Sequence, residues 1–335
     1  MSGSDSSARP RLALHDEDAL RRVVDDEVAL RSAELAFTKL ARGEALVPPP
    51  LGVDLPGVRG EVHVKGAALS GSPVFAFKVA TGFYGNAGLG LPTGSGLVLV
   101  FDARTGFPLA VLADNGWLTD LRTAAVGALA ARLLAPDRPL RLGVVGAGVQ
   151  ARLQTRLIAR VREIRDVRVW SRSEASRTAC AADVSRTLGV DATPVAGVAD
   201  ALAGADLVVT VTPSRAPLVE PSMLAPGATV IALGSDGPDK QELHPEVLAA
   251  ADKVVTDLTA QCARLGELHH AVAGALMRES DVHAELGQIL LGDRPGREGD
   301  DETIVCDLTG VGAQDAAIAE LAWAALARGG SGAGR

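Results

Sequence analysis

A glycine-rich turn between an apolar segment and a helical pattern carries the clearest chemistry in this sequence. Residues 140–145 are largely apolar and run directly into Gly146-Ala-Gly148-Val-Gln-Ala151. The first glycine permits a tight turn, the second lets the backbone approach a pyrophosphate, and the small third residue lets helix and strand pack closely. The N-terminus of the following helix then faces the phosphates. This spacing predicts a dinucleotide site formed by Gly146, Gly148, Val149, Gln150 and Ala151.

The end of the next predicted strand, residues 167–170, bears on which dinucleotide binds. An acidic residue there would take the ribose hydroxyls of NAD, but the chain continues with Ser171-Arg172-Ser173. A guanidinium between two hydroxyls suits a 2′-phosphate, so the sequence favours NADP(H) and leaves NAD(H) open. The alternative is that Arg172 is a surface residue or stacks on the adenine.

The segments around these residues alternate between short apolar runs and helical patterns. Strands are predicted at 140–145, 167–170, 207–211, 229–233 and 253–257, and helices at 150–161, 174–188 and 245–251. Such alternation predicts an α/β fold with right-handed βαβ units on a parallel sheet, which is a Rossmann domain. One further strand and one amphipathic helix are expected within residues 304–327.

The first part of the chain has a different pattern. Apolar residues recur at helical spacing from Asp16 to Arg42, and Gly43 ends that pattern. From Gly60 to Val111, short apolar runs between Gly, Pro and Asn residues are typical of an antiparallel sheet. A helix is expected at 119–135, and the proline-bracketed segment 135–139 is the predicted linker.

Composition and charge exclude several kinds of partner. The net charge is −8 and no basic block is present, so binding to nucleic acid is not expected. No stretch approaches the ~18 apolar residues of a membrane helix, and residues 1–7 lack the pattern of a secretory signal, so we expect a cytoplasmic protein. Cysteines 180, 262 and 306 are scattered, and His269-His270 has no carboxylate partner, so neither a disulfide framework nor a metal site is predicted.

Six motifs in order carry a family resemblance. They are Asn86-x-x-x-Gly-Leu-Pro-Thr93, Phe101-Asp-x-x-Thr-Gly106, Leu118-Thr-x-x-Arg-Thr-Ala-Ala125, Gly146-Ala-Gly-x-Gln-Ala151, Gly234-Ser-Asp236-x-Pro-x-Lys240-x-Glu-Leu243 and Glu285-Leu-Gly-Gln-x-x-x-Gly292. Over about residues 12–328, the chain resembles the ornithine cyclodeaminase/mu-crystallin family. The resemblance implies an N-terminal α+β substrate and dimerisation domain, a Rossmann domain, and a C-terminal helix that returns to the first domain.

On this basis we expect five segments and a homodimer. The segments are a disordered tail at 1–10, a substrate-binding and dimerisation domain at 11–137, a Rossmann NAD(P)-binding domain at 138–303, a returning segment at 304–328, and a disordered tail at 329–335. The predicted sheet around Phe75, Phe77 and Leu97–Val100 offers more apolar surface than the N-terminal helices can cover. Such a surface indicates dimerisation through the N-terminal domain.

The resemblance also implies roles for single residues. Arg122 matches the arginine that binds the substrate carboxylate, and Lys78 matches the lysine near the substrate carboxylate and nitrogen. Asp236 matches the catalytic aspartate that manages the proton of the substrate's amino group. Each has a structural alternative, which is a helix-surface ion pair for Arg122, an edge-strand charge for Lys78, and a turn cap for Asp236. Thr119 and Thr212 are further candidates for cofactor binding.

Two positions depart from the family's pattern. Members commonly carry another carboxylate-binding arginine near position 51, where this chain has Leu51. Where many cyclodeaminases have a Met-Pro pair, this chain has Lys65-Gly66, and Glu61-x-x-x-Lys65 resembles the subgroup associated with ectoine utilisation. Lys65 is therefore a candidate second carboxylate contact, with a surface strand lysine as the alternative.

Two reactions fit these residues. In the first, NAD(P)H reduces an α-imino acid or cyclic ketimine to an L-amino acid. In the second, bound NAD+ supports a redox-neutral cyclodeamination of L-ornithine to L-proline and ammonia. The missing acid after residue 170 and the absence of an arginine at Leu51 favour the reductase. A non-catalytic, mu-crystallin-like binding protein is the third hypothesis, and the retention of Lys78, Arg122 and Asp236 argues against it.

Overall fold

The computed structural model describes residues 11–330, which divide into two units. The first unit contains the chain up to Arg122 together with the chain from Val311 onward, and the second is Thr123–Gly310. The chain passes into the second unit inside helix α3 (Trp117–Leu134), upstream of the segment at 135–139 where the sequence predicted a linker. Of the predicted tails, 1–10 and 331–335 lie outside the described residues, whereas helix α11 (Gly312–Gly330) runs past 329.

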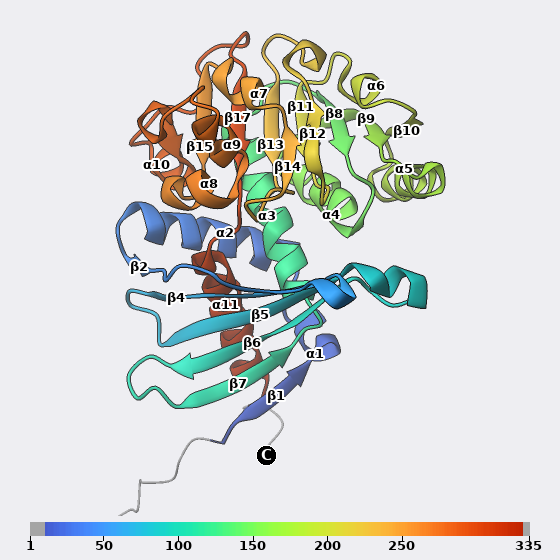
Figure 1. Cartoon of the computed structure of the whole chain (residues 1–335). Helices are drawn as coiled ribbons and strands as arrows, with labels where there is room; N and C mark the ends of the chain where they lie inside the picture. The colour runs from blue at the N-terminus through green and yellow to red at the C-terminus, as the bar shows by residue number, and fades with distance from the viewer. Residues whose placement is uncertain (1–10, 331–335) are drawn as a thin grey trace, which may run out of the picture. The chain divides into compact units, whose positions relative to one another are not determined.

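The first unit is built on a seven-stranded sheet, drawn in blue and cyan in Figure 1. The strand order is β1-β7-β6-β5-β4-β2, with β3 also paired to β4. The strands are β1 (Ala13–Asp16), β2 (Ala45–Leu46), β3 (Leu51–Leu55), β4 (Gly60–Leu69), β5 (Val74–Phe83), β6 (Gly94–Asp102) and β7 (Pro108–Ala113). β1 is parallel to β7 and the other pairs are antiparallel. The antiparallel sheet expected between Gly60 and Val111 is therefore confirmed, and β1 to β3 add to it.

Local hydrogen bonds explain where these elements begin and end. The helical pattern from Asp16 to Arg42 resolves into α1 (Glu17–Arg21) and α2 (Asp26–Ala41), each capped by the aspartate that precedes it. The Asp102 carboxylate accepts the backbone N–H groups of Arg104 at 3.0 Å and Thr105 at 2.7 Å, which forms the turn between β6 and β7.

Helix α11 covers one face of this sheet and packs on β4, β5 and α2 (Figure 1). Alternate residues of β5 are buried beneath it because successive side chains of a strand point to opposite faces. A Cβ atom at Gly312 would coincide with the backbone of Gly66, so only glycine permits this approach of α11 to β4. The first turn of α11 is thereby held against the middle of β4.

The second unit is a Rossmann fold, as the alternating pattern predicted. Its eight strands are all parallel, in the order β10-β9-β8-β11-β13-β17-β15-β16. The strands are β8 (Leu140–Val145), β9 (Ile164–Trp170), β10 (Asp191–Val195), β11 (Leu207–Thr210), β13 (Thr229–Ala232), β15 (Lys253–Thr256), β16 (Ala284–Glu285) and β17 (Ile304–Asp307). β12 (Arg215–Val219) and β14 (Gln241–Leu243) form a separate parallel pair.

The helices of the second unit connect these strands. They are α4 (Val149–Ile158), α5 (Glu174–Leu188), α6 (Val198–Leu202), α7 (Pro245–Ala249), α8 (Thr259–Leu265), α9 (Glu267–Ala273) and α10 (Leu286–Leu291). The expected strand after residue 303 is β17, which lies between β13 and β15. Residues 304–310 therefore belong to the second unit, because the apolar run Ile-Val-Cys fills a buried central position of its sheet.

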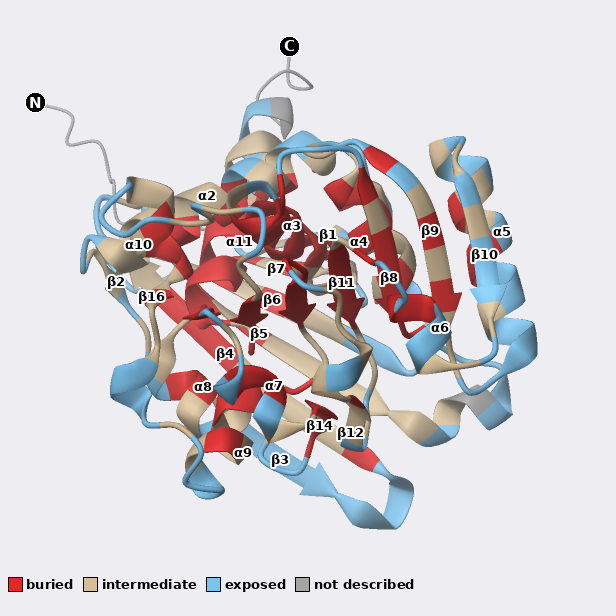
Figure 2. Ribbon diagram, turned by 90° about the horizontal axis from the view of Figure 1, so that it is seen from above, coloured by how far each residue is buried: buried red, intermediate tan, exposed pale blue. Residues whose placement is uncertain are grey.

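The burial of the strands differs between the parallel sheet of the second unit and the mixed sheet of the first unit. All four residues of β11, β13, β15 and β17 are buried, as expected for a parallel sheet with both faces covered. β3 is exposed along its whole length, and it is pale blue in Figure 2. Across residues 11–330, no helix has both the length and the apolar character required to cross a bilayer.

Candidate active site

Predicted cofactor and catalytic residues of the second unit lie at one edge of its sheet. Gly146, Ser171, Thr212 and Asp236 each follow the carboxyl end of a strand, namely β8, β9, β11 and β13. The strand order reverses between β8 and β11, since the chain extends the sheet first in one direction and then in the other. Ligands of open α/β sheets bind outside the carboxyl ends of strands at such a reversal.

The glycine-rich loop has the geometry of a phosphate cradle. Gly146 has a φ of +128°, and a Cβ atom there would lie 2.8 Å from the carbonyl oxygen of Val211. Gly148 is the N-cap of α4, has no side-chain cap, and has open space where a Cβ would stand. Ala151 is fully buried, which permits the close packing of α4. These features fit the pyrophosphate of a dinucleotide, which would accept hydrogen bonds from the first N–H groups of α4.

Arg152 holds the glycine-rich loop through the carbonyl groups of its backbone. Its Nη1 donates to the carbonyl oxygens of Ala147 at 2.8 Å and Gly148 at 3.2 Å, and its Nε donates to Asp183 at 2.7 Å. Hydrogen bonds from Arg152 and Arg186 hold the pKa of Asp183 below its usual range. The sequence analysis missed Arg152, although it directly follows the glycine motif.

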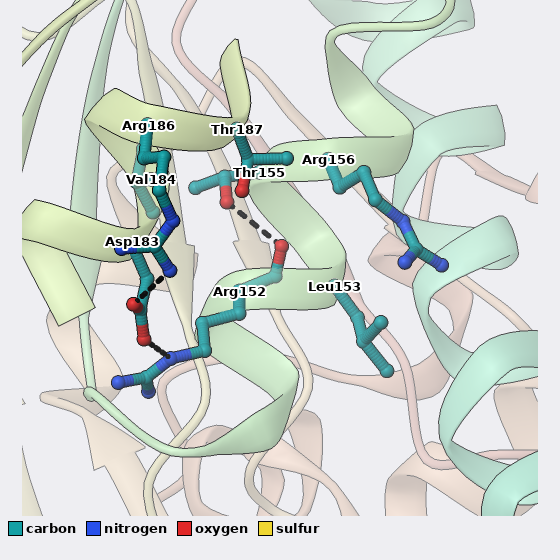
Figure 3. Close-up of a pocket in the computed structure, with 8 residues that line it drawn as sticks. All are labelled: Arg152, Leu153, Thr155, Arg156, Asp183, Val184, Arg186 and Thr187. Atoms are coloured by element: carbon teal, nitrogen blue, oxygen red, sulfur yellow. Dashed lines mark hydrogen bonds and ion pairs between the residues drawn. The ribbon is translucent and has the colours of Figure 1, made fainter.

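A pocket of about 250 Å³ lies beside this contact (Figure 3). Its lining residues are Arg152, Leu153, Thr155, Arg156, Asp183, Val184, Arg186 and Thr187. All of them come from α4 and α5, and none is a predicted site residue. Figure 3 shows Asp183 between Arg152 and Arg186, so the polar groups on this side serve to join the two helices.

The turn after β9 is shaped by its two serines. The hydroxyl of Ser171 donates to the carbonyl oxygen of Ser173, and the hydroxyl of Ser173 accepts the N–H of Ser176 as the N-cap of α5. Arg177 also donates to the carbonyl oxygen of Ser171 at 3.3 Å. Arg172 is exposed at the tip of this turn. The serines thus have local structural roles, and the guanidinium of Arg172 is presented outward.

Asp236 forms an ion pair with a lysine from its own loop. The Nζ of Lys240 lies 2.7 Å from Oδ1 of Asp236, and Lys240 is buried while Asp236 is partly exposed. The hydroxyl of Ser235 donates to the carbonyl oxygen of Lys240 at 2.6 Å, which closes the loop. The charged lysine therefore orients the carboxylate of Asp236.

The first unit contains a buried cluster of cations around one carboxylate. Lys65 on β4 and Lys78 on β5 are direct cross-strand partners, with 6% and 3% of their surfaces exposed. Arg122 on α3 is equally buried. Oδ1 of Asp315, from the first turn of α11, lies 3.1 Å from Nζ of Lys78 and 2.9 Å from Nε of Arg122. Gln314 accepts from Nη1 of Arg122 at 2.8 Å.

This burial decides between the alternatives for the three cations. A lysine that only protects a sheet edge, a helix-surface arginine and a surface strand lysine would all be exposed, so these explanations of Lys78, Arg122 and Lys65 are wrong. By contrast, Leu51 is 61% exposed and supplies no charge. Thr119 lies in the first turn of α3, which is preceded by Asp114, whose Oδ2 accepts the N–H of Leu118 at 2.8 Å.

The electrostatics of this cluster favour an additional anion. Burial and the charge of Arg122 lower the pKa of Lys78 to about 7. Although burial opposes it, the charges of Arg122, Lys78 and Lys65 lower the pKa of Asp315. Burial raises the pKa of Asp114 to about 6. Asp315 pairs with Lys78 and Arg122, and the charge of Lys65 also acts on it, so a substrate carboxylate that enters the cluster would meet three cations.

Two polar atoms of α11 lack a hydrogen-bond partner within the described residues. They are Oδ2 of Asp315 and Nε2 of Gln314, and both are buried. Sequence reasoning missed both residues, although they lie in the amphipathic helix expected near the C-terminus. Their signal would have been a Gln-Asp pair among the apolar residues of a helix, at positions that otherwise face the core. Within residues 11–330, no group of three His, Cys, Asp or Glu side chains is arranged to hold a metal ion.

Two sequence relatives match nearly the whole chain. A protein of Rhizobium meliloti (strain 1021), whose name places it among the dehydrogenases without naming a substrate, is 44% identical over 94% of this chain and 95% of its own length. An uncharacterised cyclodeaminase of Sinorhizobium fredii (strain NBRC 101917 / NGR234) is 40% identical over 94% of this chain and 96% of its own length.

Solved structures of similar proteins share the fold. The Δ1-pyrroline-2-carboxylate reductase of Thermococcus litoralis, solved with NADH and L-proline, has a TM-score of 0.90 and 28% identity, and the match covers 95% of this chain and 98% of that one. An archaeal alanine dehydrogenase dimer with bound NAD has a TM-score of 0.89 and 31% identity, covering 95% and 97%. The model of the ornithine cyclodeaminase/mu-crystallin family matches residues 17–329. The chain therefore belongs to the ornithine cyclodeaminase/mu-crystallin family.

Proposed function

We propose that this chain is an NAD(P)-dependent oxidoreductase that reduces an α-imino acid or a cyclic ketimine to an L-amino acid. The observation that carries the proposal is the buried cluster in which Lys78 and Arg122 pair with Asp315 and the charge of Lys65 acts on the same carboxylate. Such a cluster suits a small carboxylic acid. The names of the solved relatives support the proposal, since one reduces a cyclic imino acid and the other is an alanine dehydrogenase.

In this proposal, the cation cluster binds the substrate carboxylate and fixes its orientation. The planar guanidinium of Arg122 offers parallel N–H donors, and Asp315 and Gln314 hold its Nε and Nη1 in place. Lys78 and Lys65 add charge from neighbouring strands. Fixing the substrate by its carboxylate also fixes the position of the adjoining C=N carbon, which is a large part of the catalytic advantage.

The carboxyl edge of the second unit is the proposed cofactor site. A bound nicotinamide dinucleotide would supply the hydride, which none of this chain's own side chains can donate. Gly146, Gly148 and the start of α4 would hold its pyrophosphate, and Thr119 and Thr212 remain further candidates for contacts. Arg172, exposed after β9 where no acid is present, supports NADP(H) as the preferred form.

Asp236 and Lys78 are the proposed catalytic residues. Asp236 is held by Lys240 and would stabilise the protonated nitrogen of the imine. Lys78, with a pKa of about 7, can hold or release a proton near neutral pH. The cyclodeaminase remains the alternative, because one relative bears that name. The exposed Leu51 favours the reductase, since a cyclodeaminase must retain its imine through several steps and needs strong anchoring of the carboxylate.

The balance of cofactor and product separates the two reactions. We expect a cyclic ketimine acid, or pyruvate with an amine, to consume one NAD(P)H for each amino acid formed, as measured by absorbance at about 340 nm and by chromatography. L-ornithine with catalytic NAD+ should release no ammonia. Formation of proline and ammonia from ornithine without net absorbance change would establish the cyclodeaminase instead.

The choice of dinucleotide depends on Arg172. Replacing it, Arg172→Ala, should raise the Kd of NADPH roughly ten- to a hundredfold through loss of a charge-assisted phosphate contact, and should leave that of NADH nearly unchanged. Arg165→Ala is the matched control, because it removes the same charge from the opposite end of β9. Equal effects of Arg172→Ala on both dinucleotides in fluorescence titrations would refute this role.

The pKa of Lys78 predicts how carboxylate binding depends on pH. Because Lys78 must be protonated to bind an anion, the Kd of pyruvate should rise about tenfold per pH unit above 7 in calorimetric titrations. Asp114, whose pKa is raised to about 6, titrates below this range. Lys65→Met removes a neighbouring positive charge and should raise the pH at which the Kd begins to increase. Asp315→Asn removes the negative charge and should lower that pH. If neither variant moves it, the pH dependence does not come from Lys78.

We also propose a homodimer that forms through the N-terminal sheet. Phe75, Phe77, Leu99 and Phe101 lie on the face opposite α11 and are only partly buried, and the rings of Phe75 and Phe101 stack at 5.0 Å. The relative with bound NAD is described as a dimer. Light scattering at micromolar concentration should therefore give twice the chain mass of 34.3 kDa. Phe77→Lys should yield monomers, whereas Leu276→Lys, at an exposed site in the second unit, should not.

A further inference from the structure

We propose that Glu242 is a positioning residue whose buried carboxylate joins the two loops that carry Thr212 and Asp236. The inference rests on the function proposed above, because it concerns the same site. The side-chain hydrogen bonds of Glu242 go to Thr210, Thr212 and Gly234, and not to the glycine-rich loop itself. Its role is to hold the residues that do the binding and the chemistry.

The hydrogen bonds of Glu242 connect the carboxyl ends of two neighbouring strands. Oε2 accepts from the hydroxyl of Thr210 at 2.7 Å and from the N–H of Gly234 at 2.8 Å, and Oε1 accepts from the N–H of Thr212 at 2.5 Å. Thr210 ends β11, and Gly234 lies two residues after β13. One side chain on β14 therefore fixes both loops where they leave the parallel sheet.

The backbone around Glu242 is packed so closely that only glycine fits at position 234. A Cβ atom at Gly234 would coincide with the carbonyl oxygen of Thr212 and with the carboxylate of Glu242. The residue before Thr212, Val211, has its carbonyl oxygen 2.8 Å from the Cβ position of Gly146. The loop that Glu242 holds is thus in contact with the glycine-rich loop. A shift of Thr212 would be transmitted to the phosphate cradle.

Only a carboxylate can make these bonds together. Glu242 is fully buried, and burial raises its pKa to about 7 although the donors from Thr210, Thr212 and Gly234 oppose this. Two carboxylate oxygens accept from three donors, whereas a glutamine has one acceptor oxygen and an NH2 group that would face an N–H donor. Glu242→Gln therefore keeps the size of the side chain and breaks the connection between the loops.

Glu267 provides a matched control. It is also a buried glutamate, and its carboxylate accepts from the backbone N–H groups of Glu242 at 2.7 Å and Leu243 at 3.1 Å. These bonds hold β14 and reach neither Thr212 nor Gly234. Glu267→Gln thus removes a comparable buried carboxylate without directly breaking the hydrogen bonds that hold the two loops.

The test compares the full-length Glu242→Gln and Glu267→Gln proteins by thermal melting, NADPH titration and hydrogen exchange. Both variants should melt at lower temperature. Only Glu242→Gln should raise the Kd of NADPH about tenfold or more, lower kcat with little change in KM, and speed exchange of the amides of Thr212 and Gly234. Equal effects of the two variants on affinity and exchange would reduce Glu242 to a general contributor to stability and overturn the inference.

A second pair of variants covers the case in which Glu242→Gln does not fold. Gly234→Ala introduces the Cβ that the two loops exclude, and Gly237→Ala, in the same loop, meets open space. The first should weaken NADPH binding and the second should not, and equal binding by both would also overturn the inference. These titrations need no turnover, so a wild-type protein that binds NADPH but reduces no imine would refute the proposed function alone.

Discussion

One oxygen of Asp315 accepts from both Lys78 and Arg122, and much of the first unit is arranged to make this contact possible. A carboxylate buried among cations is stable only when each charge lies close to its partners, because desolvation is costly. Gly312 and Gly66 permit the close approach of α11 to β4, and the cross-strand register places Lys65 beside Lys78. This concentration of buried cations is the physical basis of the carboxylate recognition proposed above.

The proposed cofactor site of the second unit relies on backbone groups. A pyrophosphate is large and doubly charged. In place of a set of buried cations, the fold offers it the N-terminus of a helix and a backbone that glycine residues leave open to close approach. Here the charged side chains mostly hold loops: Arg152 binds two carbonyl oxygens of the glycine-rich turn, and Lys240 orients Asp236. The paths of these loops are fixed mainly by hydrogen bonds to backbone atoms, as those from Arg152 and Ser235 show.

The sequence predicted elements with strong local patterns and missed contacts between distant segments. β8 and α5 have the predicted bounds because alternating apolar runs and glycine stops are local signals. β17 was grouped with the wrong unit, since a four-residue apolar strand does not reveal its neighbours. Lys78, Arg122 and Asp236 came from the family resemblance, and Glu242 lay in one of its motifs without an assigned role. Asp315 lies in none of the six motifs and pairs with cations far away in sequence. No periodicity indicates which buried acid faces which cation.

The first unit is discontinuous in sequence, because Thr123–Gly310 is inserted between its two parts. During synthesis the ribosome therefore delivers the sheet before the second unit and helix α11 after it. Until Asp315 emerges, Lys78 and Arg122 have no carboxylate from α11, and the face of β4 and β5 lacks its covering helix. The second unit, contiguous in sequence, can fold while this face is still open. The cation cluster is thus complete only after the whole second unit has been synthesised, and a chain truncated before α11 would lack the carboxylate of Asp315.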